Sequence, residues 1–241
     1  MQRYFVNKEQ INKTIVKINE DDSYHITTVM RMDLNDKVTV CDNENTYLCK
    51  VIKLGKKVEL EIIDKLDLHP ELIQNITIAH GLVRREKMEE VVRRLVELGC
   101  YQYIPVDMKK SVVKNKDINV DRLNKIIKEA SEQSERTKLM KISNVISFNS
   151  LIKIFDSYDL VLLCHAKERE NINLFNEIKN KDFKNILVII GPESGFDDSE
   201  ISALTNYNAK IISLGKRVLR TETAPLYIMA VLSFIGEQYE N

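Results

Sequence analysis

Two segments of the chain place glycines and charged side chains directly after runs of aliphatic residues. In the first, Leu187–Ile190 is followed by the sequence GPESG at 191–195. In the second, an apolar run ends at Leu214, and Gly215 is followed closely by RTET at 220–223. Ligands of open parallel sheets bind beyond the carboxyl ends of the strands, where glycines let a ligand approach the backbone. The two segments are therefore candidates for a ligand site.

The residues of the first segment disfavour a phosphate ligand. It has neither the Lys-Ser/Thr of a P-loop nor a G-x-G-x-x-G motif. Glu193 lies in the loop, and Asp197 with Glu200 predicts a capping box, so carboxylates occupy the positive end of the following helix. The segment therefore favours a neutral or cationic ligand. A plain strand-to-helix turn is the alternative interpretation, because Gly and Pro are common in turns.

The second segment has its own alternative. Four polar side chains stand together at 220–223 between apolar stretches, which is typical of a site near a strand end. Thr223 is also able to cap the helix that follows, with Pro225 in its first turn. Taken alone, the segment is equally well explained as a helix cap with one ion pair.

The chain before residue 70 has the pattern of short strands. Five β-branched, roughly alternating segments are separated by Asn/Asp-rich turns. They are RYFV (3–6), HITTVMRM (25–32), KVTVCD (37–42), TYLCKVIKL (46–54) and KVELEIID (57–64). Five strands in this length predict a small β-barrel over residues 1–69, with the domain boundary at His69-Pro70.

From residue 70 to 241 the pattern alternates between strands and amphipathic helices. Strands are expected at 75–83, 101–108, 159–164, 186–190 and 210–214. Helices are expected at 85–99 and 120–136 from their apolar spacing, and after each of the last three strands. This alternation predicts an α/β domain with a mainly parallel sheet and helices on both faces.

Composition indicates a cytoplasmic protein without metal. Lys+Arg and Asp+Glu number 36 each, but residues 80–141 hold fifteen basic and ten acidic side chains, a balance that suits a phosphate backbone. The four cysteines and four histidines show no metal-ligand spacing, and the scattered cysteines favour reduced thiols. No apolar run approaches the length of a membrane span.

Together, GPESGF (191–196) and LGKRVLRTETA (214–224) resemble the signature of the knotted SPOUT methyltransferases, specifically the small-subunit ribosomal RNA methyltransferase E family. The resemblance covers nearly the whole chain. QRYFV (2–6) and residues 25–42 are similar to that family's PUA-like RNA-binding barrel, EKMEEVVRRLVELG (86–99) to its first helix, and EASEQSERTK (129–138) to a further segment. Ser194 departs from the pattern, since the family commonly has a second consecutive glycine there.

The resemblance implies methylation of N3 of a uridine in 16S rRNA, with S-adenosylmethionine as cofactor. It also implies a C-terminal trefoil knot, a homodimer and a role in ribosome biogenesis. The cofactor carries a sulfonium cation and no phosphate, which agrees with the acidic loop. The expected cofactor-binding residues are Leu163, His165, Gly191, Pro192, Glu193, Gly195, Leu214, Gly215, Val218, Leu219, Thr223 and Ala224.

Two residues are expected to act in the chemistry. Arg220 is the candidate for stabilising the anion that forms when the uridine N3 loses its proton. Glu193 is expected to face the sulfonium and is the less favoured proton acceptor. A structural pair of Arg220 with Glu222 or Glu193 is an equally good interpretation.

Basic residues of the barrel and the middle of the chain are the candidates for RNA contacts. They are Arg3, Arg31, Arg84, Arg85, Lys109, Lys110 and Arg136, with Lys87, Arg93, Arg94 and Lys114 as further members of a phosphate track. Solvated helix faces with ion pairs explain any single one of them as well. Two other functions compete: a non-catalytic RNA-binding or ribosome-assembly factor on the same fold, and an α/β enzyme acting on a phosphorylated small molecule.

Overall fold

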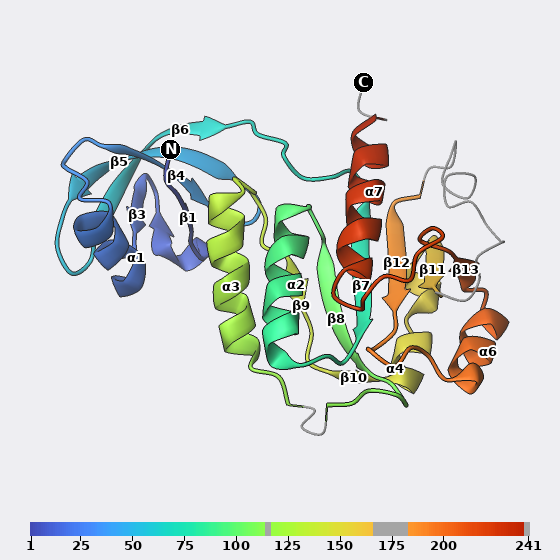
Figure 1. Cartoon of the computed structure of the whole chain (residues 1–241). Helices are drawn as coiled ribbons and strands as arrows, with labels where there is room; N and C mark the ends of the chain where they lie inside the picture. Colours follow the sequence, from blue (N-terminus) through green and yellow to red (C-terminus); the bar gives the residue numbers. More distant parts are fainter. Residues whose placement is uncertain (114–116, 166–182, 239–241) are drawn as a thin grey trace. The chain divides into compact units, whose positions relative to one another are not determined.

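The computed structural model describes residues 1–113, 117–165 and 183–238 (Figure 1). These residues form two compact units. The first unit consists of residues 1–71 together with residues 131–139, and the second of residues 72–130 and residues from 140 onward. The chain therefore leaves the first unit and later returns to complete it.

The first unit is built on a six-stranded sheet in the order β1-β4-β5-β6-β3-β2. Its strands are β1 (Arg3–Phe5), β2 (Ile11–Asn12), β3 (Ile15–Lys17), β4 (Lys37–Cys41), β5 (Thr46–Lys53) and β6 (Glu59–Leu66), and a 3-10 turn η1 covers Lys8–Gln10. The β1–β4 pair is parallel and the other pairs are antiparallel. The inward side chains form a core in which Val16, Val38 and Leu60 are fully buried. Alternation of apolar and polar residues along β4 to β6 therefore predicted these strands correctly.

The strand predicted at residues 25–32 is wrong. Helix α1 (Glu20–Tyr24) continues there into a π-helical turn, η2 (His25–Val29). The Asn19 side chain caps α1 by accepting a hydrogen bond from the Asp22 backbone N–H, and an acidic first turn suits the helix dipole. Ile26 is buried whereas Val29 is 57% exposed. The β-branched composition of this stretch misled the prediction, because its apolar side chains do not alternate between two faces.

Residues 131–139 are fixed in the first unit by a partly buried carboxylate. Glu71 accepts hydrogen bonds from the Arg136 guanidinium at 2.6 and 3.1 Å and from the backbone N–H groups of Thr137 and Lys138 at 2.9 and 3.0 Å. The Arg3 guanidinium donates to the carbonyl groups of Glu135 and Arg136. These contacts bring together residues more than sixty positions apart, which the sequence pattern did not indicate.

The second unit contains the predicted parallel sheet. Its order is β10-β8-β7-β12-β11-β13, with β9 also beside β8, and every pair is parallel. The strands are β7 (Asn75–Gly81), β8 (Gln102–Asp107), β9 (Lys141–Ile142), β10 (Ile146–Ser147), β11 (Leu160–Cys164), β12 (Asn185–Ile190) and β13 (Lys210–Ile212). The aliphatic run of β12 is buried throughout because both faces of a parallel sheet are covered.

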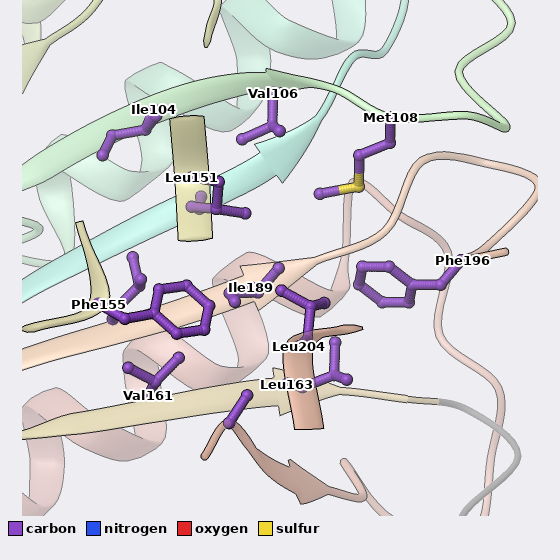
Figure 2. Packing of buried hydrophobic residues seen from close by; sticks show 13 residues of the cluster. Ile104, Val106, Met108, Leu151, Phe155, Val161, Leu163, Ile189, Phe196 and Leu204 are labelled. Atoms are coloured by element: carbon purple, nitrogen blue, oxygen red, sulfur yellow. The ribbon is translucent and has the colours of Figure 1, made fainter. Parts of the chain in front are cut away.

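The helices that accompany this sheet in the chain are α2 (Arg85–Glu97), α3 (Val120–Gln133), α4 (Phe148–Ile152), α6 (Asp198–Asn206) and α7 (Ala224–Gln238), with a 3-10 turn η3 (Phe155–Ser157). Helix α3 ends within the residues of the first unit. The helix predicted after residue 164 lies outside the described residues. Leu151 of α4 and Leu204 of α6 pack with Ile189 and Leu163 on one face of the sheet (Figure 2). Helices α2 and α7 contact each other, and α7 also contacts β7.

Candidate functional site

The carboxyl ends of β12, β11 and β13 lie side by side, because these three strands are parallel neighbours. The segments that follow them therefore meet at one edge of the sheet. They are residues 191–197 after β12, His165 after β11, and residues 213–223 after β13. They enclose a cavity of about 450 Å³. The edge-of-sheet site expected from the sequence is thus a real hollow in the structure.

Most of the residues predicted to bind the cofactor line this cavity. They are His165, Gly191, Pro192, Glu193, Gly195, Leu214, Gly215, Val218, Leu219 and Ala224, and Arg220 lines it too. Further lining residues were not among the predicted cofactor-binding residues, among them Ser194, Phe196, Asp198, Arg217 and Thr221, although the sequence marked Ser194 as a departure and Thr221 as part of a polar cluster. Two predicted residues are not part of the lining: Leu163 is buried in the core of the unit, and Thr223 stands between the lining residues Thr221 and Ala224 without lining the cavity itself. The missed residues all stand inside or next to the two glycine segments, where their position was the only signal.

The first loop is held in a compact turn. The Gly195 N–H donates to the Pro192 carbonyl at 2.9 Å, and Gly195 has a φ of 72°, which glycine adopts without strain. A Cβ atom on Gly191 would lie 3.1 Å from the Phe196 ring, so this ring packs directly on the backbone. The predicted capping box is confirmed: the Asp197 N–H donates to Glu200 at 3.0 Å, and Asp197 accepts from Ser199. Carboxylates therefore occupy the start of α6, as the argument against a phosphate ligand required.

A lysine from α2 stands between the carboxylates of the two loops. The Lys87 Nζ atom lies 3.1 Å from Glu222 Oε2 and 3.6 Å from Glu193 Oε1. Desolvation raises the pKa of Glu222, but hydrogen bonds from its own backbone N–H and from Lys87, with the charges of Lys87 and Arg220, outweigh it and hold the pKa below its usual value. Glu222 is therefore a carboxylate at neutral pH. Helical spacing placed Lys87 with the surface cations of α2, and only the fold shows that it reaches this site.

Arg220 is largely free of the protein at the cavity. Its side chain is 85% exposed, and its Nη1 atom lies 4.0 Å from Glu222 Oε1. An exposed ion pair at this distance contributes little to stability. The guanidinium is therefore able to move towards a ligand that enters from solvent.

The basic residues predicted to contact RNA have varied surroundings. Arg31 and Arg84 are exposed, and Arg85 is exposed but pairs with Glu89 at 2.8 Å. Lys109 donates to Ser199 at 2.6 Å, and Lys110 to the Phe196 carbonyl at 2.8 Å, so both lie beside the cavity loops. Arg3 and Arg136 are buried in the first unit by the bonds given above, and Lys114 lies outside the described residues.

Other kinds of site are not seen in the described part of the chain. Among its residues, no three His, Cys, Asp or Glu side chains gather closely enough to hold a metal ion. No helix within residues 1–113, 117–165 and 183–238 has the length and apolarity to cross a bilayer. The four cysteines are free thiols, and three of them are buried.

Comparison with known proteins assigns the chain to a family. A family model described as an RNA methyltransferase domain matches residues 70–233, and one described as an RNA methyltransferase PUA domain matches residues 18–63. The ribosomal RNA small subunit methyltransferase E of Bacillus subtilis is 32% identical over 98% of both chains. The chain belongs to the ribosomal RNA small subunit methyltransferase E family. The resemblance found in its two glycine segments is therefore confirmed.

Another relative and two solved structures agree with this assignment to the ribosomal RNA small subunit methyltransferase E family. The Rickettsia conorii protein is 27% identical, covering 99% of this chain and 98% of its own. The crystal structure of a hypothetical protein, 31% identical, covers 99% of this chain and 100% of its own with a TM-score of 0.86. The fold is also that of the Neisseria gonorrhoeae family member, solved bound to S-adenosyl methionine, at a TM-score of 0.88, 24% identity and 98% coverage of both chains.

Proposed function

We propose that this chain binds S-adenosylmethionine in the cavity between its two glycine loops and methylates N3 of a uridine in 16S rRNA. The cavity carries the proposal. Positive φ angles at Gly195 and Gly215 shape its walls, and a Cβ atom on either residue would point into open space. Glu193 offers a carboxylate to a sulfonium cation, while Val218, Leu219 and Ala224 offer apolar surface to an adenine ring. The residues present therefore fit this cofactor.

The chain's own residues must align the acceptor base and favour loss of its N3 proton. The bound cofactor supplies an activated methyl group. In this proposal Arg220, which is exposed at the cavity, stabilises the developing uridine anion. Lys87 holds Glu193 and Glu222 in position and neutralises part of their charge, which would otherwise disfavour an anionic base beside them. Glu193 faces the cofactor in this proposal and is not the proton acceptor.

Binding and transfer are expected to separate in one variant. Wild-type protein should bind one S-adenosylmethionine per chain in isothermal titration calorimetry. Arg220→Ala should bind it with similar affinity but transfer methyl groups to 16S rRNA about 10²–10³-fold more slowly, the usual effect of removing one group that stabilises a developing anion. Arg217→Ala, from the same loop, is the matched control and should transfer faster than Arg220→Ala. The product is read by reverse transcription, since a methyl group on N3 blocks Watson–Crick pairing.

Each other outcome has a definite meaning. If Arg220→Ala loses affinity for the cofactor in parallel with activity, Arg220 acts on the cofactor instead of the base. If the folded wild-type protein does not bind S-adenosylmethionine, the enzyme proposal is wrong, and the non-catalytic RNA-binding or ribosome-assembly factor takes its place. If nucleotides protect the protein from thermal unfolding and S-adenosylmethionine does not, the α/β enzyme that acts on a phosphorylated small molecule is favoured.

Contacts with RNA are proposed for the exposed basic residues. Arg31 in the first unit and Arg84, Arg85, Lys109 and Lys110 in the second present charges that suit a phosphate backbone. For Arg3 and Arg136 a phosphate contact requires the guanidinium to leave its carbonyl or carboxylate partners. A substrate of 16S rRNA, free or in the small ribosomal subunit, implies a cytoplasmic location.

Helix α7 supports a homodimer. Its inner face is buried in its own unit, with Ile228 and Met229 fully covered. On its outer face Tyr227 is 43% and Phe234 is 64% exposed, with Ala230 also exposed between them. Spacings of three and four place these residues in one stripe. Within the described chain α7 is therefore covered on one side only, and we propose that a second copy of the chain covers the other.

Phe234→Asp is expected to convert the homodimer into a monomer, because it places a charge in the apolar contact. Analytical ultracentrifugation should give twice the chain mass for the wild type and the single mass for the variant. Tyr207→Asp is the control, since Tyr207 is an equally exposed aromatic residue (61%) outside α7. A wild-type monomer, or a Phe234→Asp dimer, would contradict the proposal.

Membership of the family also supports the expected C-terminal trefoil knot, which we propose on that ground.

A further inference from the structure

A buried chain of hydrogen bonds runs from the sheet to both glycine loops. His80, near the end of β7, has no exposed surface. Its Nδ1 atom lies 3.0 Å from the Tyr103 hydroxyl of β8, and its Nε2 atom lies 2.8 Å from Thr221 Oγ1. Thr221 Oγ1 in turn lies 2.7 Å from the Gly191 carbonyl oxygen. Two strands and two loops therefore meet through one imidazole ring.

The positions of the hydrogens in this chain of hydrogen bonds follow from the group at its end, the Gly191 carbonyl. The Gly191 carbonyl can only accept, so the Thr221 hydroxyl must donate its single hydrogen to it. Towards His80 the hydroxyl can then only accept, so the hydrogen of the neutral ring is on Nε2. The lone pair is consequently on Nδ1, which accepts from the Tyr103 hydroxyl. One tautomer of His80 satisfies every group, and the other leaves two acceptors, the Nε2 lone pair and the Thr221 hydroxyl oxygen, facing each other.

The charge state agrees with this arrangement. Burial lowers the pKa of His80 to about 4, although the negative charge of Glu222 and a hydrogen bond with the Thr221 backbone act in the opposite direction. Burial also raises the pKa of Tyr103, whose ring is completely covered, so its hydroxyl keeps its hydrogen. The ring is therefore neutral at physiological pH, and it does not line the cavity. Its effect on a ligand must pass through Thr221 and Gly191, which do.

We propose that His80 is a positioning residue that locks the loop after β12 to the loop after β13 by holding the Thr221 hydroxyl on the Gly191 carbonyl. The inference rests on the proposed binding of S-adenosylmethionine between these loops. Without the ring, Thr221 loses the donor that orients its hydroxyl, and the Tyr103 hydroxyl is left buried without an acceptor at this end. The two walls of the cavity would then be held together less rigidly, and cofactor affinity would fall.

A set of variants separates this role from a general contribution to stability. In His80→Gln, the amide oxygen is able to accept from Tyr103 and the amide nitrogen to donate to Thr221, whereas His80→Leu does neither. Thr221→Val removes the hydroxyl at nearly constant shape, and Thr221→Ser keeps it. Ile78→Ala, in the same strand and fully buried, is the control for loss of stability without loss of the hydrogen bonds.

Cofactor affinity by calorimetry, measured below the unfolding temperature of every variant, is the first readout. His80→Leu and Thr221→Val are each expected to bind S-adenosylmethionine about tenfold more weakly or worse, as expected when buried polar partners are removed. The double variant should bind no more weakly than either single one, because both break the same chain. His80→Gln and Thr221→Ser should recover most of the affinity. Equal affinity in His80→Leu and Ile78→Ala, or no recovery in His80→Gln, would overturn the proposal.

The tautomer gives a second readout that needs no cofactor. Nitrogen NMR of the wild-type protein should show His80 with its hydrogen on Nε2 and no titration at neutral pH. In His80→Leu the amide signal of Thr221 should shift, and in His80→Gln it should stay near its wild-type position. A hydrogen on Nδ1, or a ring that titrates near pH 6.5, would overturn the proposal even if His80→Leu does not fold. If the wild type binds no S-adenosylmethionine, the proposed function fails, while the tautomer and the Thr221 signal still test the link between the loops.

Discussion

Gly81→Ala is expected to remove most of the affinity for S-adenosylmethionine. Gly81 ends β7, and a Cβ atom there would lie 2.5 Å from both the backbone nitrogen and the Cδ atom of Pro192. Because one of these neighbours is backbone, the loop at 191–195 has to move as a whole. Overpacking of this kind costs about 1–3 kcal/mol. The same displacement changes the wall of the cavity, so we expect a loss of tenfold or more in affinity by calorimetry.

A matched variant distinguishes displacement of the loop from plain loss of stability. Leu82→Ala changes the next residue, which is buried and lines a different hollow, beside Met88 and Leu123. It should lower the free energy of unfolding, measured by urea unfolding, by about 2–5 kcal/mol, which is at least as much as Gly81→Ala. The affinity for the cofactor should stay nearly unchanged. Wild-type affinity in Gly81→Ala would show that the contact with Pro192 relaxes without affecting the site.

Arg136→Ala is expected to destabilise the first unit by about 3 kcal/mol, near the lower end of the range for a buried pair, because it removes the cationic partner of the partly buried Glu71 carboxylate. The Arg136 and Glu71 side chains are only 7% and 16% exposed. Lys50→Ala removes an exposed ion pair with Glu61 in the same unit and should cost less than 1 kcal/mol. Urea unfolding followed by a probe in the first unit measures both, and equal effects of the two variants would contradict the prediction.

The same pair predicts a dependence on acid. Desolvation raises the pKa of Glu71, but the hydrogen bond and charge of Arg136 and the N–H groups of Thr137 and Lys138 outweigh it, so the folded-state pKa lies below the ordinary value of a glutamate. Stability from Glu71 is therefore fully present above about pH 4.5 and is lost as the pH falls through the folded-state pKa. In Arg136→Ala, the free energy of unfolding should therefore fall less steeply as the pH is lowered through this range. A loss of RNA binding in Arg136→Ala consequently needs a stability measurement beside it before a phosphate contact is inferred.

The sequence predicted elements well where local pattern and tertiary burial agree. The stripe Leu123, Ile126, Ile127 and Ala130 is buried on α3, as its helical spacing indicated. Local pattern failed at residues 25–29, where β-branched residues form helical turns because the Asn19 cap and the acidic turn after it start a helix. The helix cap at Asn19 therefore outweighs the β propensity of the residues that follow. Strands β2 and β3 were missed because two or three residues are too short to show alternation.

The site was predictable only up to the contacts between distant segments. Glycines after aliphatic runs identified both loops, because a strand end and a close backbone approach leave a local signature. Thr221 and His80, which are 141 positions apart, leave none, and neither does Lys87 beside Glu222. These contacts depend on β7 lying next to β12 and on the position of α2, which are properties of the sheet order and not of any short stretch.

The return of residues 131–139 to the first unit determines the order in which the protein can be completed during synthesis. A nascent chain released only to residue 71 has Glu71 but neither Arg136 nor the N–H groups that bind it. Strands β7 and β8 and helices α2 and α3 must leave the ribosome before the first unit has all its residues. Synthesis of the first unit is therefore completed only after residues 72–130 of the second unit have been made, although each unit is compact. A gene fragment that stops at the apparent boundary encodes an incomplete first unit, and one that encodes the second unit alone must replace residues 131–139 with a linker.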